Sequence, residues 1–167
     1  KMTMKVINPN DNKTVKTFEE FNTEKVNSII ESVHNDFLSW RETDFANRTK
    51  LMNKAAEILR NEKEKYAEIM VTEMGKPILQ AKGEVEKCAW VCEYYAENAE
   101  KILSKEIIKT DATESYVRFD PIGIVLAVMP WNFPLWQVFR FAAPALMAGN
   151  AGILKHASNV PMSALAI

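Results

Sequence analysis

The stretch IGIVLAVMPWNFPLWQVFRFAAPALMAGNAGILKH, residues 122–156, decides the fold of this 167-residue chain. It begins with the β-branched run IGIVLAVM, which is typical of a parallel strand buried on both faces. Pro134 suits the first position of a helix that runs to about Ala148 and ends at Gly149. AGILKH predicts a second strand, and Pro161 begins a second helix. The order predicts an α/β fold with one βαβ unit and part of the next, in an open parallel sheet.

The part of the chain before residue 116 is rich in charged residues and helical patterns. KVINPNDNKTVKTF, residues 5–18, predicts a short hairpin around a Pro/Asn/Asp turn. EIIKTDATESYVRFDP, residues 106–121, predicts an extended hairpin that is long enough to reach another subunit. Between the hairpins, four helices are expected to begin at Thr23, at Thr43 or Asp44, at Asn61 and at Ile78, and to end near Trp40, Leu59, Gly75 and Leu103.

The C-terminal part of the chain, residues 116–167, differs in composition from the rest. After residue 115 only Arg118, Asp120, Arg140 and Lys155 have a formal charge, so this part is typical of a protein interior. The last helix has no stop signal before Ile167, and a two-stranded parallel sheet buries too little to stand alone. We therefore expect an N-terminal piece of a longer protein.

Composition argues against several kinds of partner and site. The net charge is −1 and no lysine run is interleaved with aromatic residues, so no nucleic-acid partner is expected. Cys88 and Cys92 are spaced i, i+4 in a helical pattern, which makes a disulfide awkward and indicates reduced core residues. The only histidines are His34 and His156, so no metal site is expected. The N-terminus lacks the apolar region of a signal peptide, and we expect a cytoplasmic protein.

A membrane span is a possible interpretation of residues 122–139, which are eighteen residues without formal charge. Such a helix would carry Pro130, Asn132 and Pro134 at its centre, which would leave several backbone groups without partners. No polybasic flank sets an orientation either. The pattern therefore favours a globular α/β domain with no membrane partner.

Asn132 stands between two prolines that stiffen its turn. The residue before each proline, Met129 or Phe133, is driven to extended backbone. The turn is expected where a strand ends and a helix begins, which is where open α/β sheets bind ligands and where a helix N-terminus favours negative charge. The Asn132 amide would stabilise an oxyanion by roughly 3–4 kcal/mol, or it would merely cap the helix or satisfy the turn. The residues alone leave both interpretations open, and the chain has no G-x-G-x-x-G fingerprint.

Four motifs carry a resemblance to a known family. PWNFP (130–134), PIGIV (121–125), GN..ILKHAS (149–158) and TEMGKP (72–77) resemble the N-terminal portion of NAD(P)⁺-dependent aldehyde dehydrogenases. The resemblance implies an N-terminal hairpin, helices and the start of an oligomerisation hairpin in residues 1–115. It implies that residues 116–167 are the first, incomplete part of a Rossmann-like NAD(P)-binding domain, and that the catalytic domain is absent.

The resemblance also implies roles for individual residues. Asn132 matches the oxyanion-hole asparagine of the family. Met129, Pro130 and Trp131 match positions along the ribose and nicotinamide of the cofactor. Lys155 matches the lysine that binds the adenosine ribose hydroxyls. Ser158 stands where a small polar residue admits a 2′-phosphate, so the cofactor is expected to be NAD or NADP.

The substrate is implied in the same way. PWNFPLWQV together with LKHA is most similar to bacterial succinate-semialdehyde dehydrogenases, which implies oxidation of succinate semialdehyde to succinate. Arg140 matches an arginine that grips the far carboxylate of the substrate. Phe133 and Trp136 are expected to wall the same tunnel, and His156 is given no role beyond lining the loop.

The nucleophilic cysteine and general-base glutamate of the family lie beyond residue 167. Cys88 and Cys92 do not match the motif of the nucleophile, so the chain alone is expected to be inactive. The complete enzyme is expected to be a homo-oligomer, a dimer or tetramer. The alternative is a non-catalytic helical interaction module whose apolar end docks on a partner.

Overall fold

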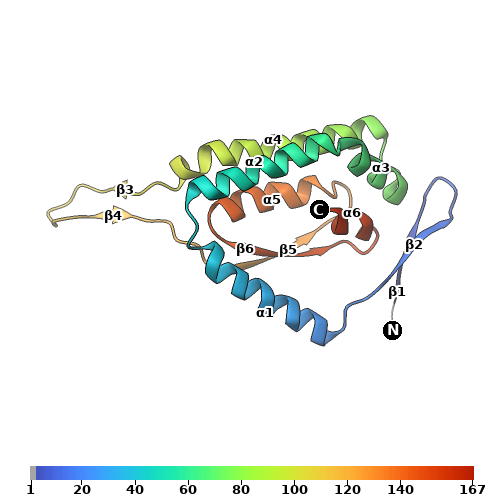
Figure 1. Cartoon of the computed structure of the whole chain (residues 1–167), viewed down its shortest axis with the longest axis horizontal. Coiled ribbons are helices and arrows are strands. Elements are labelled where there is room, and N and C mark those ends of the chain that lie inside the picture. Colours follow the sequence, from blue (N-terminus) through green and yellow to red (C-terminus); the bar gives the residue numbers. More distant parts are fainter. Residues whose placement is uncertain (1–2) are drawn as a thin grey trace.

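Three two-stranded sheets and six helices make up residues 3–167, the part of the chain that the computed structural model describes (Figure 1). The strands are β1 (Thr3–Ile7), β2 (Thr14–Glu19), β3 (Glu106–Ile107), β4 (Tyr116–Val117), β5 (Ile124–Met129) and β6 (Ala151–His156). The helices are α1 (Thr23–Trp40), α2 (Phe45–Asn61), α3 (Lys63–Met74), α4 (Ile78–Ile102), α5 (Trp136–Met147) and α6 (Pro161–Ala166). The predicted α/β class is confirmed.

The predicted βαβ unit is formed by β5, α5 and β6. The two strands are parallel, with a register that runs from Ile124 opposite Ala151 to Met129 opposite His156. In Figure 1, α2 and α4 form the upper layer, α5 lies beneath them, and α1 crosses on the other side of the strands. The sheet therefore lies between α5 and α1.

One face of the sheet is only partly covered, which makes the expectation of a strand buried on both faces wrong for β5. Gly152 packs against Phe141 of α5, so Val125, its partner in the register, and Ala127 also face α5. Leu126 and Val128 point to the opposite face and remain 65% and 64% exposed. They remain exposed because α1, which crosses on that side of the strands, does not cover them.

The helix caps confirm some predicted boundaries and correct others. Asp44 caps α2 through a 2.7 Å hydrogen bond from the Asn47 amide, as one of the two predicted starts required. Helix α1 begins at Thr23 as expected, and its N-cap is Asn22, whose side chain accepts from the Lys25 amide.

Two further boundaries lie one or two residues from their predicted positions. Helix α3 begins at Lys63 rather than Asn61, and it ends at Gly75 as expected, in the left-handed conformation with φ of 72°. Helix α5 begins at Trp136, two residues after Pro134, because the first turn is irregular.

The hydrophobic core lies between α2, α3, α4 and α5 and joins the two parts of the chain on either side of residue 116. Cys88 and Cys92 are free thiols within it, which confirms their predicted place. Burial raises the pKa of both thiols, that of Cys92 to about 12. The largest fully buried core side chains are Met70, Val85, Met147 and Leu135.

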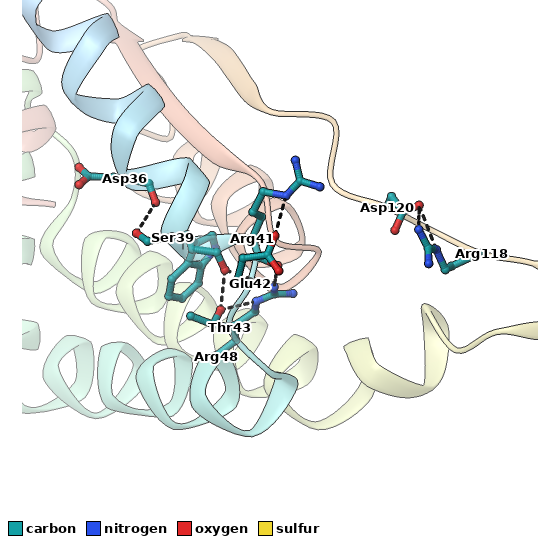
Figure 2. Close-up of polar contacts among 9 residues, drawn as sticks. Asp36, Ser39, Arg41, Glu42, Thr43, Arg48, Arg118 and Asp120 are labelled. Atoms are coloured by element: carbon teal, nitrogen blue, oxygen red, sulfur yellow. Dashed lines mark hydrogen bonds and ion pairs between the residues drawn. The ribbon is translucent and has the colours of Figure 1, made fainter.

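Arg48 of α2 links the junction between α1 and α2 to the C-terminal end of α5 (Figure 2). Its buried guanidinium donates to Thr43 Oγ1 at 2.9 Å, to Met147 O at 3.1 Å and to Arg41 O at 3.0 Å. Gly149, with φ of 85°, packs directly against the same guanidinium. This network closes the C-terminal end of α5 on the junction between α1 and α2.

The second predicted hairpin, β3–β4, projects away from the body of the molecule (Figure 1). Its paired strands are only two residues each, shorter than the sequence pattern indicated. Arg118 and Asp120, which follow β4, form an exposed ion pair at 2.8 Å (Figure 2). The predicted contact of the β3–β4 hairpin with another subunit stays a prediction.

Among residues 3–167, no helix combines the length and apolar character needed to cross a membrane.

Candidate functional site

The carboxyl ends of β5 and β6 bring most of the predicted site residues to one edge of the sheet. Because the strands are parallel and Met129 pairs with His156, the turn after β5 and the segment after β6 leave the same edge. Pro130, Trp131 and Asn132 belong to that turn, and Ser158 belongs to that segment. This is the edge at which open α/β sheets bind ligands.

The side chain of Asn132 is exposed, and its amide makes no hydrogen bond with any residue from 3 to 167. The N-terminus of α5 has no cap from its own turn. The interpretation of Asn132 as a helix cap is therefore wrong, because another residue fills that place. Its amide stays available as a donor at the sheet edge.

Glu84 of α4 caps α5 from a distance. Its buried carboxylate accepts hydrogen bonds from the Leu135 amide at 2.9 Å and the Trp136 amide at 3.0 Å, both through Oε1. Negative charge at a helix N-terminus is favourable, because the first amides have no partner in the helix. Sequence reasoning missed Glu84, although a carboxylate between the buried residues Ala81 and Cys88 of α4 was a signal.

Lys76, the lysine of TEMGKP, is the second residue that sequence reasoning missed. Its buried ammonium pairs with Glu84 Oε2 and donates to the backbone carbonyl of Asn132 at 3.1 Å. It also lies 3.9 Å from the ring centroid of Phe133, within cation–π range. The motif singled out for its resemblance thus reaches the turn after β5 directly.

His156 has a structural role, contrary to the expectation that it only lines the loop. The Ala157 amide donates to His156 Nδ1 at 2.8 Å, and Nε2 lies 2.8 Å from the Pro134 carbonyl. Since a backbone amide can only donate, Nδ1 carries no proton and Nε2–H donates to Pro134. The buried imidazole thereby ties the end of β6 to the turn before α5.

Glu73 of α3 occupies the start of α6 in the same way that Glu84 occupies the start of α5. Its carboxylate accepts from the amides of Met162 and Ser163. Both helix N-termini that follow the strands are therefore filled by the protein's own carboxylates. The expectation that the N-terminus of α5 would favour a negatively charged ligand is corrected, because Glu84 already supplies the charge.

Lys155 and Ser158 offer free donors at the sheet edge. Lys155 lies on the face opposite α5 and is exposed, with no hydrogen bond or ion pair to any residue that the structure describes. The Ser158 hydroxyl is also exposed. An ammonium and a hydroxyl suit the vicinal hydroxyls of a sugar, so these residues fit a dinucleotide cofactor.

Within residues 3–167, no cluster of three or more histidine, cysteine or acidic side chains is arranged to hold a metal ion.

Arg140 and Trp136 lie on α5, one turn apart, and so share a side of the helix. The Arg140 side chain is exposed and forms no ion pair within the described part of the chain. Trp136 is half-buried, with Lys87 Nζ 3.9 Å from its ring centroid. The helix thus carries one unpaired cation beyond the turn that holds Asn132.

The chain is similar to known proteins along its whole length. The model of the aldehyde dehydrogenase family matches residues 1–167. A succinate-semialdehyde dehydrogenase (NADP(+)) of Mycobacterium avium is 51% identical over 168 residues, an alignment that covers 98% of this chain and 36% of that protein. The chain thus spans little more than a third of the length of the relatives it matches.

Solved structures agree with this match. Succinic semialdehyde dehydrogenase from Streptococcus pyogenes, in complex with NADP⁺ as the cofactor, is 37% identical with a TM-score of 0.93, over 98% of this chain and 36% of that one. A point mutant of betaine aldehyde dehydrogenase from Staphylococcus aureus, in complex with NAD⁺, is 25% identical with a TM-score of 0.91, over 99% and 34%. The fold, the motifs and the match along the whole chain establish that it belongs to the aldehyde dehydrogenase family.

Proposed function

We propose that this chain is the N-terminal part of an NAD(P)⁺-dependent aldehyde dehydrogenase that oxidises succinate semialdehyde to succinate. The family match supports the reaction class, and relatives named as succinate-semialdehyde dehydrogenases at about half identity support the substrate. In the complete protein, we expect the enzyme to be a cytoplasmic homo-oligomer, dimeric or tetrameric, with β3–β4 in a subunit contact.

The observation that carries the proposal is the free side-chain amide of Asn132, on a turn whose backbone is held at the Asn132 carbonyl and at the amides of Leu135 and Trp136. Because Glu84 caps α5, the Asn132 side chain is not needed for the helix. Its NH₂ group is proposed to donate to the oxygen that gains negative charge when a thiolate attacks the aldehyde. A preorganised donor of this kind contributes roughly 3–4 kcal/mol to transition-state stabilisation.

The cofactor is proposed to lie along the carboxyl edge of the sheet. Met129, Pro130 and Trp131 would line its ribose and nicotinamide side, and Lys155 would donate to the adenosine ribose hydroxyls. Ser158, small and uncharged, would leave room for the 2′-phosphate of NADP⁺ without repelling it. NAD(P)⁺ supplies the oxidising capacity when bound, and the residues of this chain orient it.

Arg140 is proposed to bind the carboxylate at the far end of the substrate, with Phe133 and Trp136 along the walls. Its charge supports this role, because no described residue forms an ion pair with Arg140 and α5 contains no other charged residue. A guanidinium suits this role because it binds a carboxylate through two parallel hydrogen bonds.

The nucleophile is proposed to lie outside this chain. Burial raises the pKa of Cys88 and of Cys92, so neither thiol is an activated thiolate at neutral pH. We therefore expect residues 1–167 alone to bind cofactor weakly and to oxidise no aldehyde.

Two variants of the complete protein test the proposal. Asn132→Ala should lower kcat for succinate semialdehyde by about 100- to 1000-fold, because the oxyanion loses its donor. Arg140→Leu should reduce kcat/KM for succinate semialdehyde by about 10- to 100-fold while leaving butanal, an uncharged aldehyde of the same chain length, almost unaffected.

Arg118→Leu, which removes an exposed arginine near the hairpin, serves as the control and should change neither substrate. An equal loss for both aldehydes in Arg140→Leu would contradict the substrate assignment. Full activity of Asn132→Ala would contradict the proposed role of the amide.

A further inference from the structure

We propose that the buried ion pair of Lys76 and Glu84 positions the side-chain amide of Asn132. The inference rests on the proposed function, because it concerns the donor that function assigns. The pair comes from the α3–α4 connection and the start of α4, whereas the turn it contacts lies more than fifty residues further along the chain. Neither residue would touch substrate, so both are positioning residues.

Lys76 holds the carbonyl side of Asn132. Its Nζ donates to Asn132 O at 3.1 Å and lies over the Phe133 ring. The backbone of Lys76 is itself fixed, because Gly75 before it is the C-cap of α3 and Pro77 after it is the N-cap of α4. The ammonium therefore reaches the turn from a rigid anchor.

Glu84 holds the other side of the turn. One carboxylate oxygen accepts from Lys76, and the other accepts from the amides of Leu135 and Trp136. The first point of attachment is the carbonyl of Asn132 itself, and the second lies three and four residues further along the chain. With φ fixed at the prolines on either side of Asn132, Pro130 and Pro134, little backbone freedom remains to turn its side chain away from the sheet edge.

Stability alone does not account for this pair. The side chains of Lys76 and Glu84 are only 5% and 1% exposed, and burying two ions costs much of what their attraction returns. An apolar pair of similar volume would often stabilise the fold as well. Unlike an apolar pair, the two ions make directional hydrogen bonds to the turn. Lys76 donates to Asn132 O, and Glu84 accepts from two backbone amides. A displacement of about 1 Å in a catalytic donor is enough to lower a rate about 100-fold.

The test is the double variant Lys76→Met/Glu84→Gln in the complete protein. Methionine keeps the length of lysine without its donor, and glutamine keeps an oxygen for the Leu135 and Trp136 amides, so no unpaired charge is buried. We expect kcat to fall about 10- to 100-fold, with KM for the aldehyde changed less than about threefold. The matched control is Lys82→Met/Glu64→Gln, which removes a more exposed ion pair, 2.6 Å long, between α4 and α3 and should leave kcat unchanged.

The same double variant in a protein that lacks the Asn132 amide distinguishes a loss of positioning from general structural damage. In an Asn132→Ala background, Lys76→Met/Glu84→Gln should cost less than about threefold more, because there is no amide left to misplace. The same 10- to 100-fold loss in both backgrounds would overturn the inference while leaving the proposed function intact. An unaltered protein that forms no NAD(P)H with any aldehyde would instead overturn the proposed function, and the inference with it.

Lys76→Arg decides the question if the double variant does not fold. Arginine keeps the positive charge beside Glu84 but cannot place a single donor at the same point near Asn132 O. We expect a folded protein whose kcat falls at least about fivefold. An unchanged kcat would overturn the inference.

Discussion

Glu73 accepts hydrogen bonds from both the amide and the hydroxyl of Ser163, a residue ninety positions later in the chain, at 2.8 and 2.7 Å. All three groups are buried, so the contact fastens the short helix α6 to the end of α3. The same arrangement recurs between Glu84 and α5, which makes buried carboxylates the common device by which the helical layer holds the βαβ unit.

Removing the charge of Glu73 should destabilise the protein. Glu73→Gln replaces charge-assisted hydrogen bonds by neutral ones and turns one of the two acceptors into a donor that faces the amide of Met162 or of Ser163. We expect the free energy of unfolding, measured by urea titration, to fall by about 1–3 kcal/mol. Glu68→Gln, on the exposed side of the same helix, should change it by less than about 0.5 kcal/mol. Equal effects of the two variants would refute this role of Glu73.

Gly149 and Gly83 should respond in opposite directions to alanine. At Gly149, φ is 85° and a Cβ would lie 2.9 Å from Arg48 Nη2, so Gly149→Ala strains the backbone and displaces a buried guanidinium. We expect a loss of about 1–3 kcal/mol in unfolding free energy. Gly83 lies in α4 with open space around its Cβ position, and Gly83→Ala should stabilise by about 0.5–1 kcal/mol. A neutral Gly149→Ala would show that Arg48 moves aside freely.

His156→Leu should weaken the attachment of β6 to the turn that holds Asn132. It leaves the Pro134 carbonyl without its donor and the Ala157 amide without its acceptor. We expect a loss of about 1–3 kcal/mol in unfolding free energy. His34→Leu, an exposed histidine of α1, is the control and should have little effect. If His156→Leu and His34→Leu unfold at the same temperature, the His156 imidazole does not hold β6 to this turn.

The buried thiols predict how stability depends on pH in the alkaline range. Burial, with a smaller contribution from the Glu93 carboxylate, raises the pKa of Cys92 from 9.0 to about 12, so the folded state keeps a proton that the unfolded state releases. The contribution of Cys92 is therefore complete below pH 9 and is lost as pH rises from about 9 to 12, by about 1.4 kcal/mol per pH unit. Urea titrations at pH 7.5 and pH 10 should show a smaller alkaline loss for Cys92→Ala than for the unaltered protein. Identical losses would mean that the thiol ionises as readily in the folded state.

Ser158 provides a test of cofactor choice in the complete protein. Ser158→Glu should raise KM for NADP⁺ about tenfold or more, because a carboxylate would repel the 2′-phosphate, while KM for NAD⁺ changes little. Ser158→Gln adds the same bulk without charge and should affect both cofactors alike. A charge-independent effect on NADP⁺ would place Ser158 away from the phosphate.

Much of the fold was predictable because its signals are local. The left-handed glycine at Gly75, the cap at Asp44 and the burial of Cys88 and Cys92 depend on residues within one or two turns of each other. The apolar run of β5 predicted a strand correctly. It predicted burial on both faces incorrectly, because burial depends on what else packs against the sheet.

The site was only partly predictable. The motif PWNFP and the spacing to Lys155 indicated which residues share the sheet edge, since parallel strands end together. Neither motif nor spacing indicated that Lys76 and Glu84 hold the Asn132 turn, because each partner lies 51 to 56 residues away in the chain. Helical periodicity places Glu84 on the buried side of α4 but does not say what it faces.

The sequence by itself thus determined the order of elements, the stiff turn around Asn132 and the family to which the chain is similar, since these depend on backbone preferences and short motifs. Tertiary structure alone decided that buried carboxylates cap α5 and α6, that His156 ties β6 to that turn, and that the Asn132 amide is left free. The physical reason is that a buried charge must find its partner wherever packing places one, and packing joins residues without regard to their separation along the chain.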